Sequence, residues 1–150
     1  MIAVRELDSG QIADAARLER LCFTDGVSED ALRSFVQAQA NHYYAAAEEG
    51  CFAGYGGFSL AADEAEILTV AVVPGMRRRG IARALMERML ADAADLGAAA
   101  MYLDVRESNE AARALYRVLG FEEIGLRRNY YTKPRENAIL MQKALAREIF

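Results

Sequence analysis

The period of the apolar residues changes along the chain and predicts alternating strands and helices. The run Ile67–Val73 is apolar and rich in β-branched residues, which is typical of a buried strand. After Pro74-Gly75 and a basic turn, apolar residues recur at three- and four-residue steps over Ile81–Leu96, which is the period of a helix. Gly97 follows as the expected end of that helix. The centre of the chain is therefore predicted to be a strand, a basic turn and a helix.

The flanking patterns complete an alternation of strands and helices. Before the centre, the pattern predicts a strand, two helices separated at Thr24-Asp25-Gly26 and a hairpin, over Ile2–Leu7, Ile12–Cys22, Ser28–Val36, His42–Ala47 and Cys51–Leu60. After the centre, it predicts a strand, a short helix ended by Gly120, and a strand pair with a polar connector, over Ala99–Val105, Asn109–Leu119, Glu122–Asn129, Ala138–Ala144 and, for the connector, Tyr130–Asn137. Strand–helix–strand steps need parallel pairing and hairpins need antiparallel pairing, so we expect an α/β fold with a mixed sheet.

Three glycines interrupt the second strand of the predicted hairpin. They are Gly54, Gly56 and Gly57. Glycine inside a strand weakens it and often marks a bulge or a close approach of another part of the chain. We expect one of these two features at this strand.

The basic turn after the central strand has the residue types of an anion-binding site. The first amides of a helix lack partners, and the helix dipole adds partial positive charge there. Gly80 and Ala82 leave the backbone open, and arginines add charge at Arg77, Arg78, Arg79 and Arg83. A solvated basic loop that caps a core helix is an equally good explanation of the turn alone. Neither nucleotide fingerprint, G-x-x-x-x-G-K-[ST] or G-x-G-x-x-G, occurs in the sequence.

Composition and charge narrow the possible functions. Hydrophobic residues make up 53% of the 150 residues, so the chain can bury a core as one domain over residues 1–150. The net charge of −4 argues against nucleic acid as the main partner. Cys22, Cys51 and the single His42 lie in no metal or disulfide spacing. The charged start and the absence of a long apolar run indicate neither a signal peptide nor a membrane span, so we expect a cytoplasmic protein.

Asp104 is a candidate for acid–base chemistry. It is a carboxylate inside an otherwise apolar strand, which is unusual unless the residue is paired or functional. Strand alternation puts Asp104 and Tyr102 on the face opposite to Met101, Leu103 and Val105. The strand therefore directs the carboxylate to one side of the sheet.

Two motifs resemble those of the GNAT N-acetyltransferases. The turn Arg77-x-x-Gly80-x-Ala82 is similar to the family's Q/R-x-x-G-x-G/A, and Asn109–Phe121 is similar to its N-x-x-A-x-x-x-Y-x-x-x-G-F. The resemblance implies a GNAT fold, in which a mixed, mostly antiparallel sheet is flanked by about four helices. That sheet splays apart between two central parallel strands, which here would be Ile67–Val72 and Ala100–Val105. The resemblance also implies acetyl-CoA as cosubstrate and no metal.

The same resemblance implies roles for individual residues. Loop amides would hold the pyrophosphate of acetyl-CoA, and Asn109 would bond the coenzyme. Tyr116 would lie near the coenzyme sulfur and act as the acid. A phenol can take this role because it keeps its proton at neutral pH. Without the motif, packing in the core would be the commoner explanation for an aromatic residue at this helical position. The implied coenzyme-binding residues are Val70, Ala71, Val72, Arg77, Arg78, Arg79, Gly80, Ile81, Ala82, Arg83 and Asn109.

A wider resemblance is to one branch of this family, the bacterial ribosomal-protein-alanine N-acetyltransferases (RimI type). The similar pieces are Tyr102–Asn109, Arg127–Tyr131 and Glu136–Met141. The segment Cys22–Glu29 departs from the branch, which usually has Pro-Trp before Ser28. That helical region borders the acceptor site in the branch.

The resemblance to this branch also implies which residues would deprotonate and bind the acceptor amine. Asp104 stands at a position that is usually glutamate and is assigned as the base. A shorter acid can act through one intervening water, and Glu66 at the start of the neighbouring strand is an alternative base. Tyr130 and Tyr131, on the polar connector, would contact the acceptor.

We therefore expect an enzyme that transfers acetyl from acetyl-CoA to the N-terminal α-amine of a protein, with a ribosomal protein as the expected partner. Direct nucleic-acid and membrane partners are not expected. Two alternatives remain open from the residues. The first is the same chemistry on a small-molecule amine or a lysine. The second is an acyl-CoA-binding module without turnover, against which the presence of both Tyr116 and Asp104 argues.

Overall fold

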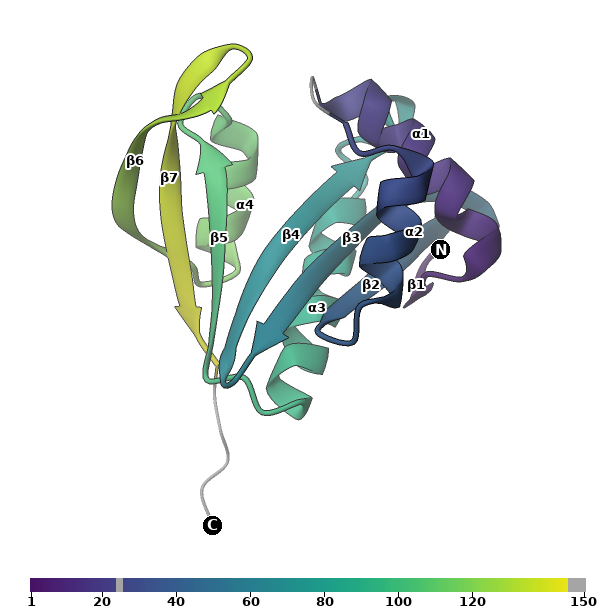
Figure 1. The fold of residues 1–150 in the computed structure, drawn as a ribbon, viewed down its shortest axis with the longest axis horizontal. Coiled ribbons are helices and arrows are strands. Elements are labelled where there is room, and N and C mark those ends of the chain that lie inside the picture. The colour runs from purple at the N-terminus through teal and green to yellow at the C-terminus, as the bar shows by residue number, and fades with distance from the viewer. Residues whose placement is uncertain (24–25, 146–150) are drawn as a thin grey trace. The chain divides into compact units, whose positions relative to one another are not determined.

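The structure is a computed structural model that describes residues 1–23 and 26–145. Figure 1 shows its elements, which follow the predicted order of strands and helices. In chain order they are β1 (Ile2–Glu6), α1 (Ile12–Cys22), α2 (Glu29–Gln37), β2 (Asn41–Glu48), β3 (Cys51–Ala61), β4 (Glu64–Val72), α3 (Ile81–Asp95), β5 (Ala100–Arg106), α4 (Glu110–Val118), β6 (Glu122–Thr132) and β7 (Arg135–Ala144). The predicted break between α1 and α2 includes Thr24 and Asp25, which lie outside the described residues.

The strands form a mixed sheet with the order β1-β2-β3-β4-β5-β7-β6. The pairs β1–β2, β2–β3, β5–β7 and β6–β7 are antiparallel, and β4–β5 is parallel. The parallel pairing joins Glu64, Ala65 and Glu66 to Ala100, Met101 and Tyr102, at the beginning of both strands. The expected α/β class and the mixed sheet with a parallel central pair are therefore confirmed.

The chain divides into two compact units, which are described separately. Unit 1 comprises residues 1–59 and 68–89, and unit 2 comprises residues 60–67 and 90–150. β3, β4 and α3 contribute residues to both. Unit 1 contains the basic turn, and unit 2 contains Asp104, Tyr116, Tyr130 and Tyr131.

Helices cover both faces of the strands in unit 1 (Figure 1). On one face, Tyr43 of β2 and Tyr55 of β3 pack in a cluster with Ala15, Leu18 and Leu32 of α1 and α2. The opposite face of β3 carries the small residues that α3 approaches.

The glycines of β3 are explained by close contacts. A Cβ atom at Gly54 would lie 2.6 Å from the Ala71 carbonyl oxygen and 3.3 Å from a methyl group of Ile81. A Cβ at Gly56 would lie 2.9 Å from the terminal methyl of Met89. Both the expected close approach and a register shift, between Ala46 and Ala47 of the paired strand β2, are present. Gly54 and Gly56 thus let β4 and α3 lie close to β3 in unit 1.

A buried carboxylate lies in the core of unit 1, and the sequence pattern did not reveal it. Glu19 of α1 accepts hydrogen bonds from the Tyr55 hydroxyl and, at 2.9 Å, from the Thr69 hydroxyl of β4. Only 4% of Glu19 is exposed. Burial, and then the charge of Glu19, raise the pKa of Tyr55 well above its ordinary value, so Tyr55 remains a donor. This bond set ties α1 to β3 and to β4 immediately before Val70.

Replacing Glu19 with alanine is expected to destabilise the fold. The change leaves the buried Tyr55 hydroxyl without its acceptor, which costs about 1–3 kcal/mol in the free energy of unfolding. Chemical denaturation followed by circular dichroism measures the loss. Asp14→Ala, which removes an exposed carboxylate of the same helix, is the control and should change stability by less than about 0.5 kcal/mol. Equal stability of the two variants would contradict a structural role for Glu19.

Strand β5 of unit 2 alternates as predicted. Met101, Leu103 and Val105 are buried, whereas Tyr102 and Asp104 on the other face are partly exposed. Leu103 and Val105 stand opposite Met141 and Ile139 of β7. The alternation that singled out Asp104 is therefore present in the structure.

The structure corrects the predicted connector Tyr130–Asn137. β6 runs to Thr132 and β7 begins at Arg135, so Tyr130 and Tyr131 lie in a strand and not on a loop. The register shifts between Arg127 and Tyr131, and Asn129 has a φ of +53°. Asparagine tolerates this left-handed conformation better than most residues. The bulge interrupts the apolar–polar alternation, which is why the pattern ended the strand too early.

Other boundaries differ by a few residues. β4 begins at Glu64, ahead of the apolar run at Ile67, and Val73 lies beyond its end. α3 ends at Asp95, and Gly97 follows with a φ of +97°. Within the part of the chain that the structure describes, no helix is long and apolar enough to cross a membrane.

Candidate functional site

The basic turn of unit 1 leads directly into the N-terminus of α3. The amide of Ala84 donates to the Gly80 carbonyl over 3.0 Å, which makes Gly80 the N-cap residue of α3. The amides of Ile81, Ala82 and Arg83 therefore have no carbonyl one turn earlier within the helix. Gly80 has a φ of +84°, a conformation that glycine adopts without strain. The nearest side-chain atom to a Cβ built there would be 4.0 Å away, on Ile2. The turn thus presents open backbone amides where the helix dipole favours an anion.

Three arginines of this turn form weak surface contacts. Arg79 pairs with Glu48 at 3.4 Å and Arg83 with Glu87 at 3.3 Å, and both arginine side chains are half exposed. Arg77 donates to the Cys22 sulfur over 3.5 Å. Surface ion pairs of this kind contribute little, so these guanidinium groups can turn to an anionic ligand.

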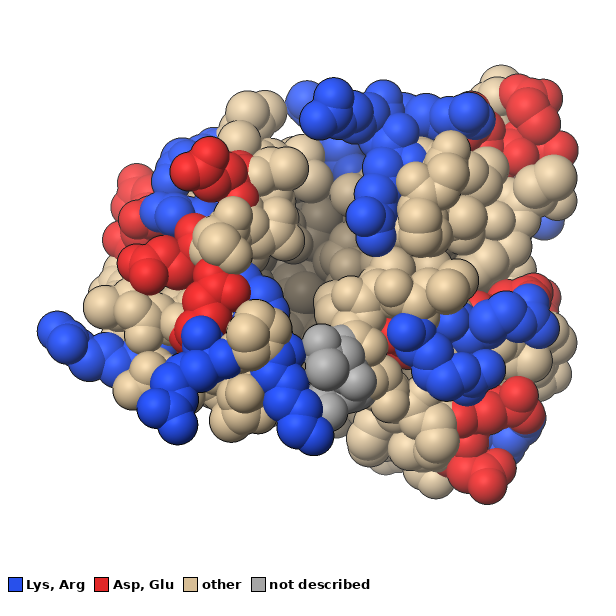
Figure 2. Space-filling model, turned by 90° about the horizontal axis from the view of Figure 1, so that it is seen from above, with Lys and Arg blue, Asp and Glu red and all other residues tan. Residues whose placement is uncertain are grey.

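Basic side chains gather in groups on the face of the molecule in Figure 2. There the Lys and Arg side chains (blue) form several clusters, with Asp and Glu (red) beside them. A net charge of −4 therefore coexists with local positive surface. At close range, an anionic ligand interacts with such local clusters more strongly than with the net charge of the whole protein.

The strand residues predicted to contact the coenzyme lie on both faces of β4. Ala71 is buried in the core of unit 1, and Val70 and Val72 are half-buried on the opposite face. The Cys22 thiol lies 3.7 Å from the Val72 carbonyl oxygen, to which it donates. Of these three residues, Val70 and Val72 offer side chains outside the core.

Asp104 is paired, and sequence reasoning did not identify its partner. Its Oδ1 atom accepts a hydrogen bond from Nε of Arg127, on β6, over 2.9 Å. The Asp104 side chain is 13% exposed, whereas that of Arg127 is 50% exposed. The guanidinium of Arg127 also lies 5.7 Å from the Tyr130 ring centre. The carboxylate is thus held in a fixed orientation, and its charge is matched by a neighbour that solvent can reach.

Tyr116 is both a core residue and a candidate acid. It is the buried residue of α4 and makes an edge-to-face contact with Phe121, with ring centres 5.8 Å apart. Burial, and then Tyr131, raise the pKa of Tyr116 to about 12. The phenol therefore keeps its proton at neutral pH, as an acid for a leaving thiolate must.

The paired tyrosines of β6 differ in environment. Tyr130 is 51% exposed, and its ring meets that of Tyr131 edge-on at 5.1 Å. Tyr131 is half-buried under the guanidinium of Arg106, which lies 4.2 Å from its ring centre. Burial, and then the charge of Asp104, raise the pKa of Tyr131 to about 12. Tyr116 and Tyr131 thus both keep their protons at neutral pH.

Asn109 caps α4. Its side-chain oxygen accepts a hydrogen bond from the Ala112 amide over 3.1 Å. Capping by asparagine is favourable at this position. The side-chain NH₂ group of Asn109 is a separate donor that this bond does not use.

Unit 2 thus contains Asp104 on β5, Tyr116 on α4 and Tyr131 on β6. Glu66 stands opposite Tyr102 in the β4–β5 register and is exposed. The residues that sequence reasoning missed are Arg127, Arg106 and Glu136, whose contacts depend on the register of β5, β6 and β7. Among residues 1–23 and 26–145 there is no group of three or more His, Cys, Asp or Glu side chains placed to hold a metal ion.

Comparison with known proteins places the chain among acetyltransferases. A family model described as the acetyltransferase (GNAT) family matches residues 12–121. The [ribosomal protein bS18]-alanine N-acetyltransferase of Escherichia coli K12 is 34% identical over 145 residues, which cover 94% of this chain and 96% of that protein. The N-alpha-acetyltransferase RimI of Mycobacterium tuberculosis is 41% identical over 107 residues, which cover 69% of this chain and 66% of that protein.

A solved structure has the same fold. The crystal structure of the ribosomal-protein-S18-alanine N-acetyltransferase from Escherichia coli superposes with a TM-score of 0.90 and 32% identity. The match covers 99% of this chain and 97% of that one.

Proposed function

Because the chain belongs to the acetyltransferase (GNAT) family, we propose that it transfers the acetyl group of acetyl-CoA to the N-terminal α-amine of a ribosomal protein. The observation that carries the proposal is the set of side chains in unit 2, where the Asp104 carboxylate is held by Arg127 and the buried Tyr116 phenol keeps its proton. The names of the relatives from Escherichia coli and Mycobacterium tuberculosis support the N-terminal amine as acceptor.

The turn at Gly80 is proposed to hold the pyrophosphate of the coenzyme. The amides of Ile81, Ala82 and Arg83 donate to phosphate oxygens, and Arg77, Arg78, Arg79 and Arg83 supply charge. Val70, Ala71 and Val72 would contact the pantetheine arm along β4. Asn109 would use its free NH₂ donors on the coenzyme while its oxygen caps α4.

The proposed reaction is a direct transfer. The neutral amine attacks the thioester carbonyl carbon, the carbon–sulfur bond breaks, and Tyr116 gives its proton to the departing thiolate. The proton lost by the amine passes to Asp104 through a water. We favour the water-mediated path because Arg127 already occupies one carboxylate oxygen. Asp104 then orients the amine more than it abstracts the proton directly.

A weak base, Asp104 acting through a water, suits an N-terminal amine better than a lysine. The pKa of an α-amine is about 7.7–8.0 and that of lysine about 10.4. The difference of about 2.5 units corresponds to roughly 3.5 kcal/mol more deprotonation cost for lysine. An enzyme without a strong base therefore favours N-termini at neutral pH.

Coenzyme A release from matched peptides tests this proposal. One peptide begins with alanine and carries an internal lysine, and its control is the same peptide with a blocked N-terminus. We expect release with the first and background with the second. Equal release from both would support lysine acetylation, and release only with small amines would support the small-molecule alternative. Coenzyme binding without any release would support a non-catalytic module.

A further inference from the structure

The end of β5 carries Arg106, whose guanidinium group contacts an aromatic ring, two backbone carbonyls and a carboxylate. Arg106 lies two residues after Asp104, and its guanidinium stacks on the Tyr131 ring with 4.2 Å between the guanidinium carbon and the ring centre. Its Nη1 atom donates to the Pro134 carbonyl over 3.1 Å, and its Nη2 atom to the Lys133 carbonyl over 3.2 Å. These carbonyls belong to the turn between β6 and β7. Arg106 therefore fixes both the ring of Tyr131 and the turn that follows it.

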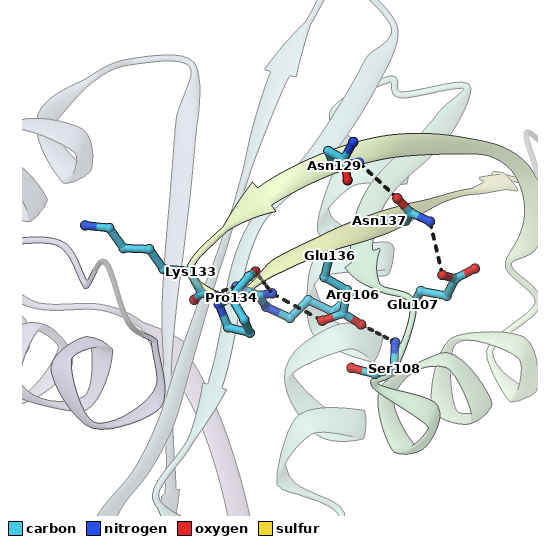
Figure 3. A network of polar contacts seen from close by, with 8 residues as sticks. All are labelled: Arg106, Glu107, Ser108, Asn129, Lys133, Pro134, Glu136 and Asn137. Atoms are coloured by element: carbon cyan, nitrogen blue, oxygen red, sulfur yellow. Dashed lines mark hydrogen bonds and ion pairs between the residues drawn. The ribbon is translucent and has the colours of Figure 1, made fainter.

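Glu136 connects this arginine to the start of α4 (Figure 3). One carboxylate oxygen pairs with Arg106 at 3.2 Å, and the other accepts the amide of Ser108 at 2.6 Å. Ser108 precedes Asn109, the cap of α4, which is the helix that carries Tyr116. The bonds from Ser108, and then the ion pair with Arg106, hold the pKa of Glu136 below its ordinary value. The carboxylate is thus committed to these two partners.

A second set of bonds holds the bulge of β6 in place. The Asn137 side chain accepts the amide of Asn129 over 2.9 Å and donates to Glu107 over 3.3 Å (Figure 3). The Glu107 amide in turn donates to the Asn137 carbonyl over 3.0 Å. Both the bulge before Tyr130 and the turn after Tyr131 are therefore tied to the segment Arg106–Ser108.

We propose that Arg106, held by Glu136, is a positioning residue that sets the Tyr131 ring for the first residue of the acceptor peptide. The proposal rests on the proposed function, because it assigns Tyr131 to acceptor binding. Arginine suits this task since its planar group stacks on a ring while its edges bond to carbonyl and carboxylate oxygens. A lysine keeps the charge but cannot do both.

Arg106→Lys is expected to raise the KM for a peptide beginning with alanine by about tenfold, in line with the loss of a partly desolvated cation–π contact. The acetyl-CoA affinity, measured by calorimetry, should stay unchanged, and kcat should fall less than KM rises. A purely structural role would impair all three quantities, the peptide KM, the acetyl-CoA affinity and kcat, or none of them. The matched control is Arg113→Lys, because Arg113 also bonds a carboxylate and a backbone carbonyl in unit 2 but does not stack on Tyr131. It should leave the peptide KM unchanged.

A double-mutant cycle shows whether Arg106 acts through Tyr131. In the Tyr131→Ala background, Arg106→Lys should cause no further rise in the peptide KM. Additive effects, or an unchanged KM in the single variant, would overturn the proposal while wild-type N-terminal acetylation still stands. If the wild-type protein does not acetylate peptide N-termini, the proposed function fails first and this proposal fails with it.

Discussion

Gly80→Glu is expected to lower the affinity for acetyl-CoA by at least about 100-fold, since hydrogen bonds to charged groups contribute roughly 1.5–3 kcal/mol each and at least two would be lost. The side chain would enter the space over the first amides of α3, where only Ile2 lies within 4.0 Å of the added Cβ. Its negative charge would also replace the phosphate that the helix terminus favours. Isothermal titration calorimetry with acetyl-CoA measures the loss.

The matched control for this variant is Gly97→Glu. Gly97 has a φ of +97°, close to the +84° of Gly80, and a Cβ there would meet no atom within 4 Å. The backbone strain is therefore similar, but the residue follows the opposite end of α3. Gly97→Glu should bind acetyl-CoA as the wild-type protein does. If both variants lost affinity equally with their circular dichroism unchanged, the turn at Gly80 would not be the coenzyme site.

Tyr116→Phe is expected to lower kcat by about 100- to 10,000-fold, which is the usual contribution of a general acid. The variant keeps the ring that packs on Phe121 and removes only the hydroxyl. Acetyl-CoA binding should be unchanged. Single-turnover measurement of coenzyme A release isolates the chemical step, and Tyr43→Phe, which removes a hydroxyl from the core of unit 1, is the control. Wild-type turnover in Tyr116→Phe would assign Tyr116 to packing alone.

The pH profile gives an independent check on Tyr116. Its pKa is raised to about 12, so the protonated form that donates is fully present below that value. The single-turnover rate should therefore not fall between pH 7 and about pH 10 through loss of this proton. A rate that fell in this range with peptide and coenzyme saturating would contradict a phenol with a raised pKa as the acid.

The order of the elements could be predicted because the core-facing residues keep a regular period. The apolar steps of Ile81, Leu85 and Met89 and the alternation of β5 correspond directly to buried faces. The turn at Gly80 before α3 was also predictable, since a helix start and its glycine are adjacent in sequence. Local patterns thus identified the elements and the residues that belong to one turn.

The ion pairs of the site could not be predicted, because they join residues on different strands. Arg127 reaches Asp104 and Arg106 reaches Glu136 only in the observed register of β5, β7 and β6. A shift of one residue in the register of a strand moves all of its side chains to the opposite face. The bulge at Asn129 explains why Tyr130 and Tyr131 were expected on a loop. The burial of Glu19 could not be predicted either, because its partners, Tyr55 and Thr69, come from β3 and β4.

The most direct test of the proposed function is to locate the acetyl group by tandem mass spectrometry. The substrate is a peptide that begins with alanine and contains an internal lysine, incubated with the protein and acetyl-CoA at neutral pH. We predict a single acetyl group on the first residue, with less product from Asp104→Asn and from Tyr131→Ala. Acetylation mainly on the lysine, or no acetylated peptide while small amines are modified, would contradict the account.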